Sequence, residues 1–113
     1  AIDALVANSQ SSYGLRSSNG YNKNRLIQLI GILSYFGKID LNAKDIYVNI
    51  SNGLNTDDIS IELAMANSIL SSFYNKSIIQ RCYGEIRLNG RVVNGYADDE
   101  EITHINDLIK KYK

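Results

Sequence analysis

A strict alternation of apolar and polar residues in the middle of the chain gives way to a helical period. Ile46, Val48 and Ile50 would share one face of a strand, with Tyr47 and Asn49 on the other face. After a polar loop, apolar residues recur at spacings of four and three, which is typical of one face of a helix. They are Ile59, Leu63, Ala66, Leu70 and Phe73. The pattern predicts a buried strand, a tight turn and a long amphipathic helix.

The boundaries of these elements follow from the residues between them. Asn52-Gly53 should end the strand, because Gly and Asn adopt positive φ at little cost. The helix should begin near Asp57, whose carboxylate can accept bonds from the first backbone N–H groups. Asp58 and Glu62 would lie at the positive end of the helix dipole.

The N-terminal part of the chain predicts two strands and a second helix. Ile2–Ala7 is a short strand candidate, and a polar Ser/Asn/Gly loop follows it. A further strand is expected near Tyr13–Arg16. A helix from Asn22 to Phe36 is apolar over more than half of its circumference, so it should be buried, and Gly37 should end it.

A hairpin is predicted after the central helix and a connection over Lys76–Arg81. Tyr83–Ile86 would form its first strand, and Val92 and Val93 would begin the return strand. The turn between them contains Asn89-Gly90, which suits the two positive-φ positions of a type I′ turn.

The C-terminal residues predict a final helix from Asp98 to Tyr112. Four acidic residues would open it, and three lysines would close it, as the helix dipole favours. Its apolar face would consist of Ile102, Ile105, Leu108, Ile109 and Tyr112.

Composition limits the classes of function that fit this chain. Its 113 residues suffice for one domain with a single core. The formal net charge of +0 means that any nucleic-acid binding must come from a local patch. Cys82 is the only cysteine, so an internal disulfide is impossible and a reducing compartment is expected. The start AIDALVANSQ lacks the features of a signal peptide, and no apolar run reaches the roughly 20 residues that span a bilayer.

Four stretches carry a resemblance to a known family. They are ALV near the start, NGYNKNRLIQLIGIL and VNISNGLNTDDISIELAMANSILSSF in the first two thirds, and GEIRLNGRVV near the end. Together they resemble the Lon-protease-like C-terminal domain of the RadA/Sms DNA repair proteins. The resemblance implies an α/β (α+β) fold of the ribosomal protein S5 domain 2-like type, a mixed sheet with packed helices. The family pattern continues beyond residue 113, so a single domain, 1–113, with an incomplete C-terminus is expected.

The resemblance also implies a damaged catalytic site. True Lon proteases carry a nucleophilic Ser in a D-G-P-S-A-G turn, and alignment with TDDISIE places Ser60 there. The Lon partner is a Lys, and its position falls on Asp99. Lys110 is 11 residues further on, roughly 16 Å along a helix, and Lys76 follows Ser60 by 16 residues, roughly 24 Å. Neither lysine should reach the Ser60 hydroxyl. We therefore expect no catalytic residue, because catalysis needs both the serine and its lysine base.

Other reactive side chains favour structural roles. His104 is the only histidine and has no companion cysteine spaced for a metal, so no metal site is predicted. The acidic pair Asp57-Asp58 and the run Asp98–Glu101 could hold a cation, but helix capping and solvation explain them better. Cys82 is most simply a small core residue.

Basic residues are the remaining candidates for function. Arg16, Lys23 and Arg25 flank the first loop and helix and could contact DNA phosphates, although a solvated surface is the simpler explanation. Arg25 could instead pair with a carboxylate. Lys38 and Lys44, which follow the helix, belong to the same group of candidates, and Arg87 and Arg91 on the hairpin are weaker ones.

By resemblance, the chain would be a protease-dead domain of a cytoplasmic DNA repair and recombination protein in a bacterium or organelle. It would act as an oligomerisation scaffold, for which a hexamer is one expected form, and as a weak DNA-contacting surface. No cofactor is expected in this chain, because ATP and zinc would belong to other regions of the parent protein. Two alternatives stay open: an active Lon-type Ser peptidase with Ser60 as its nucleophile, and a plain assembly domain without DNA contact.

Overall fold

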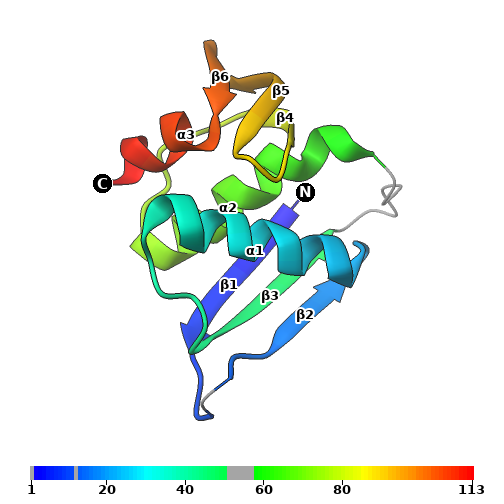
Figure 1. Cartoon of the computed structure of the whole chain (residues 1–113), viewed down its shortest axis with the longest axis vertical. Coiled ribbons are helices and arrows are strands. Elements are labelled where there is room, and N and C mark those ends of the chain that lie inside the picture. Colours follow the sequence, from blue (N-terminus) through cyan, green and yellow to red (C-terminus); the bar gives the residue numbers. More distant parts are fainter. Residues whose placement is uncertain (1, 12, 51–57) are drawn as a thin grey trace.

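The computed structural model describes residues 2–11, 13–50 and 58–113, and it contains two small sheets with three α-helices (Figure 1). The elements follow the order β1 (Ile2–Asn8), β2 (Arg16–Asn19), α1 (Lys23–Gly37), β3 (Lys44–Ile50), a 3₁₀ turn (Ile59–Ile61), α2 (Glu62–Tyr74), β4 (Cys82–Ile86), β5 (Arg91–Ala97), β6 (Glu100–His104) and α3 (Ile105–Tyr112). The mixed α/β class is therefore confirmed. The predicted Asn52-Gly53 turn and the Asp57 cap lie outside the described residues.

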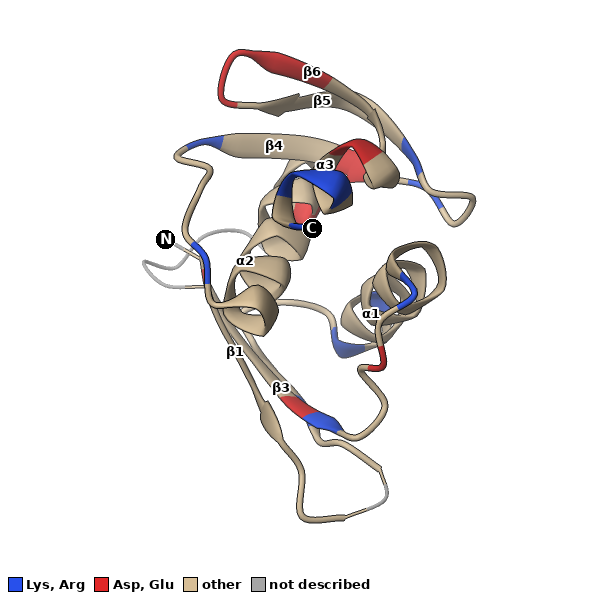
Figure 2. Ribbon diagram, turned by 90° about the vertical axis from the view of Figure 1, so that its left-hand side faces the viewer, with Lys and Arg blue, Asp and Glu red and all other residues tan. Residues whose placement is uncertain are grey.

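The first sheet has the strand order β1-β3-β2, with β3 in the centre. β1 pairs with β3 antiparallel over seven residues, and β2 pairs with β3 in parallel. Ile46, Val48 and Ile50 are buried, whereas Tyr47 and Asn49 are exposed, so the predicted alternation of β3 is confirmed. One face of this sheet therefore packs on the core and the other faces solvent (Figure 2).

The position predicted for the second strand was wrong by several residues. Gly14 packs so closely on the chain at Lys44 that a Cβ at Gly14 would come within 1.7 Å of the Lys44 carbonyl oxygen. The chain reaches its parallel register with β3 only afterwards, and β2 begins at Arg16. Tyr13 and Leu15, which lie within the predicted range, are exposed.

The two long helices agree closely with the hydrophobic pattern. Asn22 caps α1 by accepting a bond from the Arg25 backbone N–H at 3.0 Å. α2 begins later than predicted, because Ile59–Ile61 forms a 3₁₀ turn that takes the place of its first turn. Ile59 is consequently 55% exposed, so its assignment to the apolar stripe was wrong, while the later members of the stripe are buried or half-buried. Among the described residues, none of the helices combines the length and the apolar character needed to cross a membrane.

The second sheet has the order β4-β5-β6 and is antiparallel throughout. The hairpin predicted between β4 and β5 exists, but its turn differs from type I′. Within this turn only Gly90 has a positive φ, at 87°, and the Gly90 N–H donates to the Arg87 carbonyl at 2.9 Å. The Arg87 N–H donates to the Arg91 carbonyl at 2.8 Å, which encloses a three-residue loop with Gly in its left-handed position.

The predicted final helix is partly a strand. Asp98, with φ 53°, turns the chain back on itself, and Glu100–His104 pairs with β5. β6 alternates, with Ile102 buried between the exposed Glu101 and Thr103, a period that the helical interpretation overlooked. α3 therefore spans only Ile105–Tyr112, and the acidic run lies in a hairpin instead of at a helix start.

One hydrophobic core joins both sheets. α1 and α2 cover the inner face of the first sheet, and α3 contacts both of these helices and β6 (Figures 1 and 2). The fully buried side chains at its centre come from every layer and include Leu29, Ile46, Met65, Ile69, Ile102 and Leu108.

Candidate functional site

Ser60 lies in the exposed 3₁₀ turn that precedes α2, and its hydrogen-bond partner is a carboxylate. The Ser60 hydroxyl donates to Asp58 Oδ1 at 2.6 Å, and the Ser60 backbone N–H donates to the same oxygen at 3.0 Å. The hydroxyl bond, and then the backbone bond, lower the pKa of Asp58. A carboxylate with a lowered pKa is a weak base, so this contact orders the turn and does not activate the serine.

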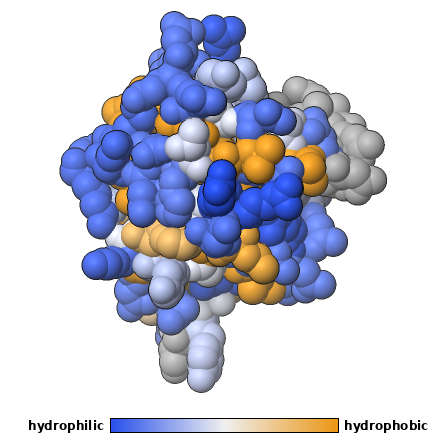
Figure 3. Space-filling view, turned by 45° about the horizontal axis from the view of Figure 1, so that its top comes forward, coloured by the Kyte–Doolittle hydropathy of each residue, from blue (hydrophilic) through white to orange (hydrophobic). Residues whose placement is uncertain are grey.

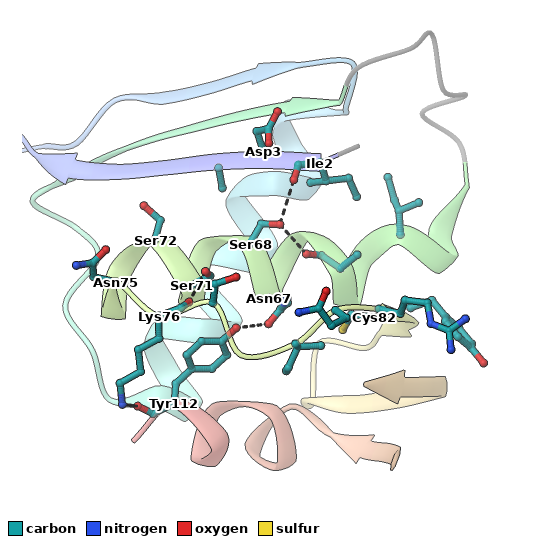
Figure 4. Close-up of a pocket in the computed structure, with 18 of the residues that line it drawn as sticks. Ile2, Asp3, Asn67, Ser68, Ser71, Ser72, Asn75, Lys76, Cys82 and Tyr112 are labelled. Carbon is teal, nitrogen blue, oxygen red and sulfur yellow. Dashed lines mark hydrogen bonds between the residues drawn. The ribbon is translucent and has the colours of Figure 1, made fainter. Parts of the chain in front are cut away.

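A polar groove of about 940 Å³ extends from Ser60 along α2 (Figure 4). Small polar side chains of α2 line it, and two of them fasten the edge strand β1. The Ser72 hydroxyl accepts from the Val6 N–H at 2.9 Å, and the Ser68 hydroxyl lies 3.4 Å from the Ile2 carbonyl oxygen. These hydroxyls satisfy backbone groups that would otherwise be unpaired on the outer side of β1.

Lys76 lines the same groove but is directed away from Ser60. Its Nζ donates to the Tyr112 backbone carbonyl at 3.0 Å, and the Tyr112 hydroxyl donates to Asn67 Oδ1 (Figure 4). The 13 residues of α2 separate Lys76 from Ser60 by roughly 20 Å. The expectation that Lys76 cannot act on Ser60 agrees with this arrangement.

Asp99, the position that corresponds to the Lon lysine, lies in the turn between β5 and β6. It is exposed and belongs to the second sheet, whereas Ser60 precedes α2. The prediction that Asp99 lies near the start of a helix was therefore wrong. Lys110, the other candidate base, lies on α3 within 3.8 Å of Asp107.

The most strongly constrained charges in the described structure are Arg25 and Glu62. Arg25 binds the Glu62 carboxylate through Nε and through Nη2, the latter at 2.9 Å, and its Nη2 also donates to the Ile86 carbonyl. The Ile86 N–H donates to Glu62 Oε1 at 2.9 Å. The pair thereby joins α1, α2 and β4, and the alternative that Arg25 pairs with a carboxylate is confirmed.

Glu62 is the residue whose role the sequence interpretation missed. It is only 2% exposed, although it was assigned to the dipole at the helix start. Its spacing of four from Ala66 and eight from Leu70 places it on the apolar stripe, and that spacing could have revealed it. Burial and then the charge of Glu62 raise the pKa of Tyr21, whose hydroxyl lies 3.4 Å from the carboxylate.

The three candidates for DNA contact differ in how their side chains are held. The Arg16 guanidinium donates to the Lys44 carbonyl at 2.6 Å and to the Leu41 carbonyl at 2.9 Å, and burial lowers its pKa. Arg25 is engaged by Glu62. Lys23 is exposed at the first position of α1. The two arginines therefore support the local fold, and Lys23 is the most accessible of the three.

His104 and Cys82 both have structural surroundings. His104 caps α3, where its Nδ1 accepts from the Asn106 N–H at 3.1 Å, and its ring packs edge-on against Phe36. Cys82 is half-buried at the start of β4, and burial, with a smaller effect from Asp98, raises the pKa of its thiol to about 12. Asp98 Oδ1 in turn accepts from the N–H groups of Gln80 and Arg81, at 3.0 Å each, so it fastens a loop instead of capping a helix.

Comparison with known proteins identifies the relatives of this chain. It is 38% identical over 94 residues to the DNA repair protein RadA of Helicobacter pylori, a match that covers 81% of this chain and 21% of that protein. The identity is 36% over 103 residues to the RadA protein of Campylobacter jejuni, with 89% of this chain and 23% of that protein covered. For Chlamydia muridarum RadA it is 30% over 112 residues, covering 97% of this chain and 23% of the relative.

These matches confirm the resemblance that the sequence motifs indicated. The chain spans about a fifth of the length of the curated relatives that it matches. No family model matches the chain.

Proposed function

We propose that this chain, which is homologous to a segment of the RadA DNA repair proteins, serves DNA repair as a scaffold without peptidase activity. It would assemble copies of its parent protein and place basic side chains near DNA. Hydrolysis of ATP and binding of zinc would belong to other parts of the parent, which would work in the bacterial or organellar compartment that holds the DNA. The names of the relatives support the role in repair.

The observation that carries the loss of peptidase activity is the partner of Ser60. Its hydroxyl donates to the Asp58 carboxylate, and the lysine position of the Lon pattern is occupied by Asp99, an exposed residue of the β5–β6 turn. A serine nucleophile needs a base that accepts its proton within hydrogen-bond distance. Asp58 meets the distance requirement, but its lowered pKa makes it a poor proton acceptor.

A peptidase assay tests this part of the proposal. We expect the chain to leave unfolded casein intact, alone and at high protein concentration. Ser60→Ala is the diagnostic variant, and Ser77→Ala, which changes another serine of the same groove, is its matched control. Casein cleavage by the wild-type chain that disappears in Ser60→Ala and persists in Ser77→Ala would establish the Lon-type alternative.

The contribution to DNA binding would be small for each copy. The chain has no net charge, and two of the three candidate side chains are bound to protein groups. A ring would multiply a weak patch around one channel, because contacts made by linked copies add through effective concentration. Lys23 would then provide the principal phosphate contact.

A salt titration of DNA binding tests the contact. We expect Lys23→Ala to weaken binding a few-fold and to reduce the slope of log K against log salt by about one for each copy bound. Lys110→Ala removes an exposed lysine from α3 and serves as the control. DNA binding that does not depend on salt, or equal effects of the two variants, would contradict a phosphate contact at Lys23.

A further inference from the structure

Gly31 has no steric reason to be glycine within the described part of the chain. It lies in the interior of α1 and is exposed, and beyond the backbone of its own helix no atom of the described residues lies within 4 Å of the position that its Cβ would occupy. A glycine in a helix interior costs about 1 kcal/mol relative to alanine. Something outside this fold that approaches the helix closely would account for that cost.

Gly31 lines an apolar groove of about 600 Å³ between α1 and the β4–β5 hairpin. Tyr35 of α1 and Leu88 of the hairpin turn also line the groove and are 77% and 66% exposed. Ile27, one turn earlier on α1, is 46% exposed. We call Ile27, Gly31, Tyr35 and Leu88 the α1 face. Figure 3 shows, on one side of the molecule, apolar side chains that reach the surface among hydrophilic ones.

The outer side of the second sheet presents another set of uncovered aromatic side chains. Tyr83 of β4 lies opposite Tyr96 of β5, with ring centres 5.5 Å apart, and Glu101 of β6 continues the row. The two tyrosines are 49% and 37% exposed. We call Tyr83, Tyr96 and Glu101 the tyrosine face. Tyrosine is enriched at protein–protein interfaces because it combines a large apolar surface with a hydroxyl.

The charges around these two faces are complementary. Lys23 and Lys38, both exposed, lie at the two ends of α1. The tyrosine face contains Glu101 and adjoins the exposed acidic residues of the β5–β6 turn. Figure 2 shows this acidic turn and α1 at separate places on the molecule. A second copy of the chain therefore offers a face with the opposite charge, and the neutral chain contains both halves of the contact.

We infer that the α1 face of one copy binds the tyrosine face of the next copy, head to tail. The aromatic rings would enter the groove over Gly31, and Lys38, at the C-terminal end of α1, would face the acidic hairpin. A contact between two different faces produces a ring if the rotation closes and a filament if it does not. This inference rests on the scaffold role proposed above and names the surface that performs it.

Variants of each face, measured by sedimentation velocity and by concentration-dependent amide NMR shifts, test the contact. Gly31→Gln fills the groove and improves helix propensity, so any loss of assembly cannot come from weaker folding. We expect it to raise the dissociation constant at least tenfold. Glu101→Lys should also weaken assembly, and adding Lys38→Glu to it should restore part of the loss. Lys110→Glu, on α3, is the control for charge.

The outcomes separate the contact from the scaffold role. Wild-type assembly that Gly31→Gln and Glu101→Lys disrupt, with amide shifts centred on the two faces, supports the inference. Wild-type assembly that both variants leave unchanged overturns this contact and leaves the scaffold role standing. A wild-type chain that stays monomeric at millimolar concentration, without concentration-dependent shifts, overturns both.

Discussion

Arg25 on α1 and Glu62 on α2 form an ion pair whose carboxylate is closed off from solvent, with side-chain exposures of 24% and 3%. Because the Ile86 backbone also binds both partners, the pair fixes the first sheet's helices to the second sheet. Hydrogen bonding to Glu62 raises the pKa of Arg25 despite its partial burial. Arg25 is thus a structural residue, because its guanidinium holds α1, α2 and β4 together.

Removing one partner of this pair should lower the free energy of unfolding strongly. Arg25→Ala would leave the Glu62 carboxylate buried and unpaired, which costs about 3–5 kcal/mol in comparable cases. The free energy of unfolding from urea titration measures the change. Lys110→Ala, which removes an exposed pair with Asp107, should cost less than about 0.5 kcal/mol. Equal losses in the two variants would refute a structural role for Arg25.

Two glycines should respond to alanine in opposite directions. Gly90 has φ 87°, and a Cβ there would lie 2.6 Å from the His104 ring and 2.9 Å from Phe36. Gly90→Ala should therefore lower the melting temperature and cost at least about 1–2 kcal/mol. Gly31→Ala meets open space on a helix and should stabilise the monomer by up to about 1 kcal/mol. Thermal unfolding of both variants at low protein concentration provides the test.

Asp107 should make the stability of α3 depend on pH. Burial opposes ionisation of this carboxyl, but hydrogen bonds from the Thr103 and His104 N–H groups outweigh it and lower the pKa of Asp107. Its stabilising contribution is therefore present above the unfolded pKa of about 3.9 and is lost as pH falls through the lower folded pKa. Asp107→Asn should cost about 1 kcal/mol at pH 7.

The difference between Asp107→Asn and the wild type should shrink as pH falls below the unfolded pKa of about 3.9 and through the lower folded pKa of Asp107, because the carboxyl becomes protonated in both folding states of the wild type. Urea titrations at pH 7 and pH 2.5 measure it. A difference that stays constant between these pH values would show that the charge of Asp107 does not support the cap.

Cys82 should react slowly in the folded chain. With its pKa raised to about 12, the thiol forms little thiolate at pH 8, and only the thiolate attacks disulfide reagents. We expect its reaction with Ellman's reagent to be slower by on the order of a hundredfold or more than that of a free cysteine, and to become fast in urea. A fast reaction without denaturant would show that the thiol is not held in this environment.

Cys82 should also contribute to a loss of stability in alkali. Because its folded pKa lies above the unfolded value of about 8.5, the unfolded chain loses its proton first as pH rises. The stabilising effect of the buried thiol is complete below that value and declines above it. Cys82→Ala should remove this part of the alkaline decline in urea titrations between pH 8 and pH 10.

Periodicity located most elements but failed where a turn decided the local structure. The acidic run and the three terminal lysines matched a single helix, yet Asp98 reverses the chain and Glu100–His104 becomes a strand. His104 and Asp107 then form the capping box that begins α3. Charge order along the sequence is the same in both interpretations, so it could not distinguish them.

The sequence by itself determined the buried alternation of β3, the apolar faces of α1 and α2, and the family resemblance, because these depend on residues close together in the chain. Only the tertiary structure decided that Glu62 is the partner of Arg25, that Ser60 faces Asp58, and that Asp99 lies in the β5–β6 hairpin. Those relationships depend on how distant elements pack, and the free energy of burying a carboxylate is set by that packing and not by local spacing.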